Sequence, residues 1–404
     1  MRFLKFSLPF FAIVLLISCS KDEIANKQLI PQLDISSGKA PSLASEENAK
    51  YISGDYIVVF NNDVDVDKEV GNAEKAHGVK AKFKYKYALK GFSATLPLQA
   101  LEGLRSNPKV KYIEQDQQMN AITTQTSVPS WGIDRIDQVS RPLSNSYDYK
   151  NTGLGVTAYI IDTGIKFNHS EFGLRAFFGF DAFNGNGSDA NGHGTHVSGT
   201  VGGNTMGVAK EISLVAVRVL DASGSGSTSG VAAGIDWAVN NHSNSPAVAN
   251  MSLGGGASTV IDDAVKRAVS DGIVMCVAAG NSSRNASQFS PARVVEAITV
   301  GATTSSDALA SYSNYGSIVD ILAPGSNITS SWNTSTIATN TISGTSMATP
   351  HVTGVAALYL QSYPSSKPSD VQNELISKAT LGKISLSGAA KSAGTQNRLL
   401  FTNY

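Results

Sequence analysis

Four polar residues lie far apart in the sequence, and each stands where an apolar run ends or a helical pattern begins. They are Asp162 after VTAYII, His193 at the start of HGTHVSG, Asn281 after VAAG, and Ser346 before MATPHVTGVAALYL. A serine hydroxyl becomes a nucleophile when an imidazole accepts its proton and a carboxylate orients that imidazole. An amide side chain and the free N–H groups of a helix start can stabilise the resulting oxyanion. The four residue types therefore predict acyl transfer by nucleophilic catalysis.

Each residue also has a simpler interpretation when it is taken alone. Ser346 could be an ordinary helix N-cap, and Asp162 could be the first residue of an Asp-Thr-Gly turn. His193 and His196 are three residues apart, which suggests a metal site, but no glutamate stands between them as in His-Glu-x-x-His. A zinc site would also leave Asp162 and Ser346 unexplained.

Three further residues near these motifs receive structural roles. We expect His196 to pack or hydrogen-bond within its helix, and His351 to be structural. Pro350 should lie in the first turn of the helix that starts between Thr345 and Met347, because an N–H missing there has no intrahelical partner.

The elements that must position these residues follow from the apolar runs between 131 and 404. VTAYIID, SLVAVRVL, AVANMSL and GIVMCVAA are continuously apolar and alternate with helical patterns. Continuous strands are buried on both faces, which predicts an α/β fold with a parallel β-sheet flanked by helices. Ligands bind at the carboxyl ends of such strands, where Asp162 and Asn281 stand.

The N-terminal part has a different pattern. Residues 51–120 read strand, helix, strand, strand, helix, strand, which predicts a small ferredoxin-like α+β domain. Residues 19–50 form a polar tether, and residues 120–130 form a linker to the domain of residues 121–404.

The first residues form a targeting segment. Arg2 and Lys5 precede an apolar run too short to span a bilayer, which is typical of a signal peptide over residues 1–18. Leu16-Ile17-Ser18-Cys19 resembles a lipobox and predicts lipidation of Cys19, the alternative being an ordinary signal peptide. The other cysteine, Cys276, is then left without a disulfide partner and is expected to be a buried, inert thiol.

Composition excludes several classes of protein. The chain has 404 residues, a formal net charge of zero and 42% hydrophobic residues. This length suggests two or three units, and the hydrophobic content excludes a disordered chain. With no net charge, nothing in the composition indicates nucleic-acid binding.

Five motifs together resemble the subtilisin-like serine proteases (peptidase family S8), and within them the proteinase K-like branch. They are AYIIDTGI, NGHGTHVSGTVGG, NMSLGGG, VAAGNSS and SGTSMATPHVTG. The resemblance implies that Asp162, His193 and Ser346 form the triad and that Asn281 is the oxyanion donor. The domain of residues 51–120 similarly resembles an inhibitor I9-type propeptide. One departure is Val197, where much of this branch has a cysteine.

The resemblance also implies an extended substrate cleft for polypeptides, with backbone pairing and side-chain pockets. The small residues of the VAAG motif suggest a roomy pocket for an apolar or aromatic side chain. The expected substrate-binding residues are Ser225, Gly226, Ser252, Leu253, Gly254, Ala278, Ala279 and Gly280.

A structural calcium is allowed by the same resemblance, although the chemistry requires no cofactor. Asp320 aligns with a family calcium ligand, with the carbonyls of Val295 and Ala297 as partners. Waters would have to complete the roughly 6–8 oxygen ligands that calcium prefers.

These expectations combine into a secreted serine endopeptidase made as a self-processing precursor, with its own propeptide as intramolecular inhibitor. The precursor would be held at the outer membrane or cell surface by lipid on Cys19, and the mature enzyme, a monomer, would be extracellular or periplasmic. Two rivals are a non-catalytic binding protein of the same fold and a lipase or esterase. The four polar residues argue against the first, and the absence of Gly-x-Ser-x-Gly around Ser346 argues against the second.

Overall fold

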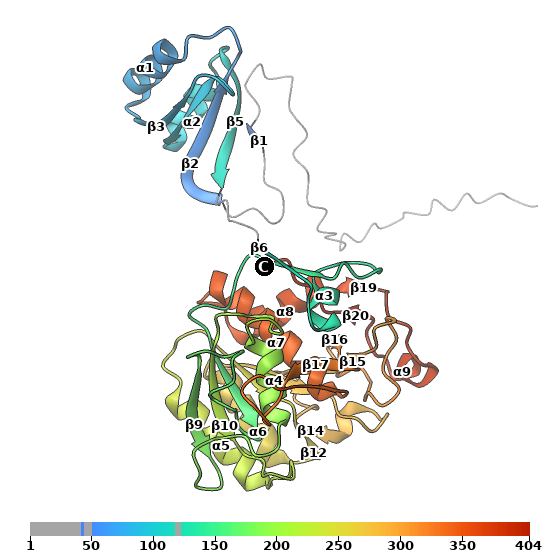
Figure 1. Ribbon diagram of the computed structural model, residues 1–404. Helices are drawn as coiled ribbons and strands as arrows, with labels where there is room; N and C mark the ends of the chain where they lie inside the picture. The colour runs from blue at the N-terminus through green and yellow to red at the C-terminus, as the bar shows by residue number, and fades with distance from the viewer. Residues whose placement is uncertain (1–41, 44–50, 118–122) are drawn as a thin grey trace, which may run out of the picture. The chain divides into compact units, whose positions relative to one another are not determined.

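The computed structural model describes residues 42–43, 51–117 and 123–404. The chain forms two compact units, Met1–Asn120 and Ala121–Tyr404 (Figure 1). The signal peptide, Cys19 and most of the tether lie outside the described residues. Within the described ranges, no helix combines the length and apolar character needed to cross a membrane.

The first unit has the expected β-α-β-β-α-β order, and a short strand, β1, precedes it. The five strands are ordered β1-β5-β2-β4-β3 in one sheet. The elements are β1 (Ser42–Leu43), β2 (Tyr51–Phe60), α1 (Val66–His77), β3 (Ala81–Tyr85), β4 (Gly91–Thr95), α2 (Leu98–Arg105) and β5 (Val110–Gln117). Helix α1 begins after Asp65, whose carboxylate accepts from Lys68 N, and it ends at Gly78, which has φ 64°. An aspartate before the first helical residue and a left-handed glycine after the last one are both common at helix ends.

The second unit contains the long parallel sheet. Its strands are β6 (Thr123–Thr126), β7 (Ser146–Tyr149), β8 (Thr157–Asp162), β9 (Ala176–Asp181), β10 (Ser213–Arg218), β11 (Ala247–Met251), β12 (Gly255–Gly256), β13 (Val274–Ala278), β14 (Phe289–Ser290), β15 (Ile298–Thr303), β16 (Ile321–Pro324), β17 (Ile328–Ser331), β18 (Thr339–Ile342), β19 (Thr380–Leu381) and β20 (Arg398–Leu399). Its helices are α3 (Trp131–Ile136), α4 (His193–Gly202), α5 (Thr228–Asn241), α6 (Thr259–Ser270), α7 (Thr345–Ser362), α8 (Pro368–Lys378) and α9 (Gly388–Ser392).

Nine strands are ordered β19-β20-β16-β15-β13-β11-β8-β10-β9. All neighbouring pairs are parallel except β19 and β20. Strand β8 lies between β10 and β11. The strands that directly follow β8 in the chain, β9 and β10, lie on one side of it, and β11 and β13 lie on the other side. Such a switch point is where parallel sheets bind ligands, and Asp162 is the last residue of β8.

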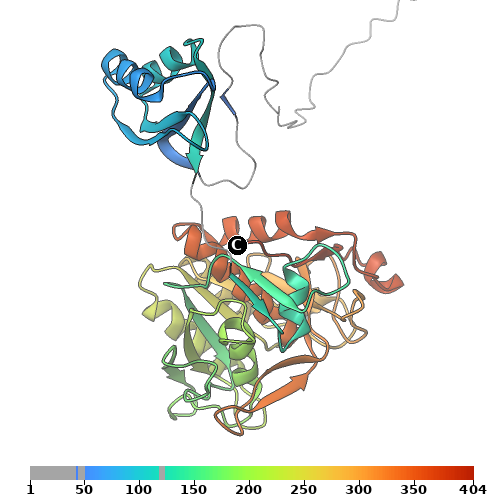
Figure 2. The ribbon, with the colours of Figure 1, turned by 45° about the horizontal axis from the view of Figure 1, so that its top comes forward.

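Helices cover both faces of this sheet, as the continuously apolar strands predicted (Figure 1 and Figure 2). Along β8, Ala158 and Ile160 join one core cluster, which includes residues of α4 and α7. Tyr159 and Ile161 join the other cluster, which includes residues of α5 and α6. The alternation of side chains along a strand thus divides each strand between two core layers.

The expected linker of residues 120–130 is folded from Thr123 onward. Strand β6 pairs antiparallel with β7, because its threonines favour a pleated strand and β7 offers a partner. Gln125 Nε2 donates to Thr205 O at 2.8 Å, and Lys210 Nζ donates to Gln125 Oε1 at 2.6 Å. The part of the linker that the structure describes therefore belongs to the second unit.

Candidate active site

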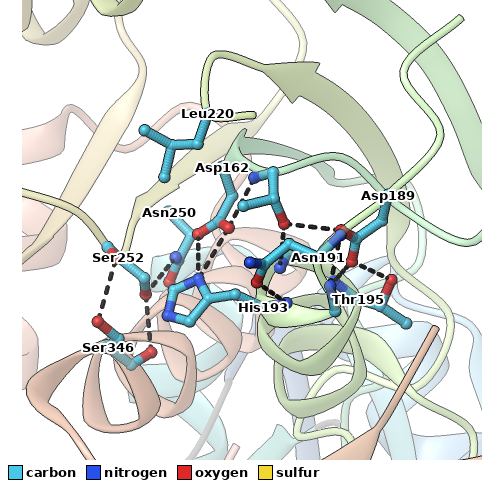
Figure 3. Close-up of polar contacts among 12 residues, drawn as sticks. Asp162, Asp189, Asn191, His193, Thr195, Leu220, Asn250, Ser252 and Ser346 are labelled. Atoms are coloured by element: carbon cyan, nitrogen blue, oxygen red, sulfur yellow. Dashed lines mark hydrogen bonds and ion pairs between the residues drawn. The ribbon is translucent and has the colours of Figure 1, made fainter. Parts of the chain in front are cut away.

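Asp162 and His193 lie together at the switch point of the sheet (Figure 3). His193 Nδ1 is 2.8 Å from Asp162 Oδ1 and 3.0 Å from Oδ2. The Asp162 side chain is fully buried, whereas the His193 side chain is 24% exposed. Because a carboxylate only accepts hydrogen bonds, Nδ1 carries the proton, and Nε2 of the neutral ring is free to accept one.

The electrostatic environment favours protonation of His193. Burial lowers the pKa of His193, but the charge and hydrogen bond of Asp162, together with the charge of Asp189, raise it. With these effects combined, the pKa of His193 lies above its ordinary value of 6.5. This is the direction expected for an imidazole beside a buried carboxylate.

A turn formed by residues 189–192 sets the start of α4, where His193 is the first helical residue. The Asp189 carboxylate accepts from the N–H groups of Asn191, Gly192 and Thr195 at 2.9 Å each. It also accepts from the hydroxyls of Thr195 at 2.6 Å and Thr163 at 2.8 Å. Sequence reasoning missed this residue, although an aspartate before a glycine-rich helix start is a signal for such a turn.

Ser346 lies in the first turn of α7, beside His193 and Ser252 (Figure 3). Its hydroxyl donates to Ser252 O at 3.0 Å, and Ser252 Oγ donates to Ser346 O at 2.7 Å. Ser252 Oγ accepts in turn from Asn250 Nδ2 at 2.8 Å. Two reciprocal hydrogen bonds thus join the start of α7 to the segment after β11.

Pro350 was expected in the first turn of α7, and this expectation is wrong. The helix begins at Thr345, so Pro350 is its sixth residue. A proline there cannot donate to the carbonyl four residues earlier, which belongs to Ser346. The Ser252 hydroxyl donates to that carbonyl instead.

Asn281 points its side chain at the same helix start. Its Oδ1 accepts from Thr345 N at 2.8 Å and from Thr345 Oγ1 at 3.0 Å. Because a backbone N–H can only donate, this contact fixes Oδ1 toward Thr345 and leaves Nδ2 for another acceptor. Asn281, Ser346 and the first N–H groups of α7 therefore converge on one point.

A groove of about 560 Å³ extends from His193. Five of the expected substrate-binding residues line it, namely Ser225, Gly226, Ser252, Leu253 and Gly254. Ala278, Ala279 and Gly280 do not, and Ala278 and Ala279 are buried. Sequence reasoning missed several apolar lining residues that come from helices α5 and α6 and the loop before α5, namely Leu220, Val231 and Ile261.

His196, His351 and Cys276 are held in the core. His196 Nε2 donates to Ile328 O at 3.0 Å, so it bonds to β17 and not within its own helix as expected. His351 Nδ1 donates to Met347 O at 2.9 Å. Burial lowers the pKa of both rings to about 4 and raises the pKa of the buried Cys276 thiol to about 12. Among the described residues, no group of three or more His, Cys, Asp or Glu side chains could hold a metal ion.

Asp320 lies near the two carbonyls expected to share a calcium with it. Gln372 Nε2 contacts Val295 O at 3.4 Å and Ala297 O at 3.3 Å, and Thr299 N donates to Asp320 Oδ2 at 2.8 Å. Burial raises the pKa of Asp320 to about 6. Two carbonyls and a half-buried carboxylate are donors that fit calcium, but the Gln372 amide would have to turn to admit the ion.

Known proteins resemble this chain in sequence over both of its units. Residues 153–400 match the model of the subtilase family, and residues 55–121 match that of peptidase inhibitor I9. An extracellular serine proteinase of Thermus sp. (strain Rt41A) is 49% identical over 91% of this chain and 94% of its own length. Alkaline serine exoprotease A of Vibrio alginolyticus is 45% identical over 94% of this chain and 73% of its own length.

A solved structure supports the same assignment. The crystal structure of a cold adapted subtilisin-like serine proteinase superposes with a TM-score of 0.65 at 52% identity. It covers 68% of this chain and 98% of its own chain. The chain belongs to the subtilase family and is an exported serine endopeptidase made with an inhibitor-type propeptide.

Proposed function

We propose that Asp162, His193 and Ser346 are the catalytic residues of this endopeptidase. The single observation that carries the proposal is the buried Asp162 carboxylate held against His193 Nδ1, which leaves Nε2 free to accept a proton. Rotation of Ser346 about its Cα–Cβ bond moves the hydroxyl from the Ser252 carbonyl toward His193. His193 then takes the proton as Oγ attacks the scissile carbonyl, and later gives it to the leaving amine.

Asn281 and the Ser346 N–H stabilise the tetrahedral oxyanion. The Asn281 amide is held by Thr345 with Nδ2 directed away from that residue. The Ser346 N–H is one of the first N–H groups of α7, which have no acceptor within the helix. Both donors are in place before charge develops, so they need no reorganisation during the reaction.

The groove binds an extended polypeptide. Gly226 and Gly254 present backbone groups for strand pairing, and the apolar side chains of Leu220, Leu253 and Ile261 form a pocket. The Ser225 N–H and carbonyl are already bonded to Asp221, so Ser225 only lines the groove. The apolar lining of this pocket favours an apolar or aromatic side chain of the substrate, whereas Ala278, Ala279 and Gly280, which lie outside the groove, have no part in the proposal. The mature enzyme is a monomer in this proposal.

The unit of residues 51–120 acts as the intramolecular inhibitor until the enzyme cuts itself free. The cut precedes Thr123, because Thr123–Thr126 pair with β7 in the second unit and a later cut would remove that strand. The catalytic domain then comprises residues from about 121 to 404.

Replacing Ser346 by alanine tests this function. The variant should give no measurable proteolysis and should accumulate as the full-length precursor when expressed in a protease-free host. In subtilisin, loss of the serine leaves only ~10³–10⁴-fold catalysis over water, and this scale is taken from that enzyme. Gel analysis and casein zymography measure both outcomes, with Ser305→Ala, an exposed serine, as the matched control. A serine-directed phosphonate should label the wild-type enzyme but not Ser346→Ala. Normal maturation of Ser346→Ala would contradict self-processing.

The pH dependence follows from the pKa of His193. Protonated His193 cannot accept the serine proton, so kcat/KM should fall as the pH drops through this pKa. Because Asp162 and Asp189 raise it, the midpoint of the acid limb should lie above pH 6.5. Steady-state kinetics on a soluble peptide between pH 5 and 9 measure it. A midpoint clearly below 6.5 would show that His193 is not the base or that Asp162 does not support it.

Lipidation of Cys19 remains our proposal for the precursor, and this residue lies outside the described part of the chain. Lipid there would hold the propeptide at the membrane, since each buried CH₂ contributes ~0.8 kcal/mol. The Ser346→Ala precursor should incorporate labelled palmitate and sediment with membranes, and Cys19→Ala should abolish both. Absence of label from the Ser346→Ala precursor would favour an ordinary signal peptide. The mature wild-type enzyme should be soluble in either case.

A structural calcium at Asp320 is proposed from its donors, with the carbonyls of Val295 and Ala297 as partners. When bound, the ion would compensate the half-buried carboxylate and tie the segment before β15 to β16. Calcium should raise the melting temperature of the mature enzyme after inactivation by a phosphonate, and Asp320→Asn should remove that increase. Asp263→Asn, at an exposed carboxylate, is the control. An equal response of Asp320→Asn and the control would contradict the assignment.

A further inference from the structure

A hairpin far along the chain packs against the turn that carries His193. Strands β17 and β18 pair antiparallel, and the hairpin tip, residues 332–338, is closed by Trp332 N donating to Ala338 O at 2.7 Å. Asn333 Nδ2 donates to the backbone carbonyl of Asp189 at 3.2 Å. The Trp332 indole lies against Gly192, where a methyl group would come within 2.4 Å of the ring. The hairpin tip thus touches both ends of the turn.

This contact matters because Gly192 gives the turn little stiffness of its own. Gly192 is the N-cap of α4, makes no side-chain cap and has φ 116°, a conformation that favours glycine. A residue without a side chain has nothing of its own to pack. The indole occupies the space where a side chain would be, so it restricts movement of the backbone directly before His193.

The indole also reaches the second turn of the same helix. Its ring stands edge-on to His196, with centroids 6.2 Å apart and planes at 79°. His196 Nε2 bonds to the carbonyl of Ile328 in β17. The hairpin therefore contacts α4 at two places, at Gly192 before its first turn and at His196. Residues on either side of His193 are therefore fixed by one hairpin.

The hairpin tip is itself anchored. Ser170 N donates to Thr336 O at 2.7 Å, and His169 Nε2 donates to Ala338 O at 2.9 Å. His169 Nδ1 accepts from Glu171 N at 3.2 Å, which fixes the proton on Nε2. These bonds hold the tip to the segment after β8, so it can act as a rigid support.

We propose that Trp332, assisted by Asn333, is a positioning residue for the catalytic histidine: it holds the turn of residues 189–192 so that His193 meets Asp162 and Ser346 together. This inference rests on the catalytic roles proposed above. The inner side of the turn is fixed by the Asp189 carboxylate, and the hairpin supplies the support on its outer side. A small displacement of a reacting group, about 1 Å, can cost ~10²-fold in rate.

The chain offers a matched control for removal of the indole. Trp237 of α5 also packs on a glycine, Gly179, where a methyl group would lie 2.6 Å from the ring. It also stands edge-on to an aromatic ring, that of Tyr159, at 6.3 Å and 80°. Trp237→Leu therefore removes the same kind of packing from the other core layer, away from His193.

The experiment compares Trp332→Leu with Trp237→Leu as mature enzymes, with active sites counted by a phosphonate titrant. Both should lose thermal stability. Trp332→Leu alone should lower kcat by about tenfold or more with KM within about twofold, because the displaced group acts in the transition state. Asn333→Ala should give a smaller loss in the same direction, and Trp332→Phe should restore part of the activity.

The pH profile separates positioning from a general loss of stability. Burial lowers the pKa of His193, and the carboxylates of Asp162 and Asp189 raise it, so a loosened ring changes both effects. The acid limb of Trp332→Leu should therefore move, while that of Trp237→Leu stays in place.

Wild-type kcat and an unmoved acid limb in Trp332→Leu would overturn the proposal. If Trp332→Leu fails to mature, kcat and the acid limb of Trp332→Phe and Asn333→Ala test the proposal instead, since each of these variants keeps most of the packing. Wild-type values in both variants would overturn the proposal. Failure of the catalytic assignment would look different, because the wild-type enzyme would then keep its activity after phosphonate treatment.

Discussion

The buried contact between Asp162 and His193 is the interaction on which the site depends. Asp162 is fully buried, and an uncompensated carboxylate there would be costly. Thr163 N donates to it at 2.7 Å, and His193 Nδ1 supplies the other main contact. The sheet therefore fixes the Asp162 carboxylate at the end of β8. The other segments of the domain must then hold the His193 ring against this carboxylate.

The helices that carry His193 and Ser346 begin differently from their neighbours. Helices α5 and α6 begin at Ser227 and Ser258, whose hydroxyls accept from the first turn. Helices α4 and α7 begin at glycines without a side-chain cap. A glycine N-cap costs only a few tenths of a kcal/mol relative to serine. In return, the Ser346 N–H stays available for the negative charge that we propose develops there, and the turn before α4 can pass close to the Trp332 indole.

Much of the fold could be predicted from the sequence, because continuous apolar strands and their polar carboxyl ends are local patterns. That Asp162 and Asn281 lie at the same edge of the sheet follows from the geometry of parallel strands. The remaining contacts join distant segments, such as Ser252 with Ser346, 94 residues apart, and Asn333 with Asp189, 144 apart. No local pattern encodes such pairs. For the same reason the sequence placed Pro350 too early in α7 and treated β6 as linker.

His193 and Ser346, between which we propose the proton transfer, are held to different degrees. His193 is fixed by a buried carboxylate on one side and by a braced turn on the other. The Ser346 hydroxyl makes one hydrogen bond of 3.0 Å to the Ser252 carbonyl, which rotation about a single bond can break. The Ser252 hydroxyl meanwhile fixes the backbone of Ser346, because it donates to the Ser346 carbonyl, to which Pro350 cannot donate. The backbone of Ser346, the proposed nucleophile, is thus held while its hydroxyl stays free to turn, so rotation toward His193 needs no backbone movement.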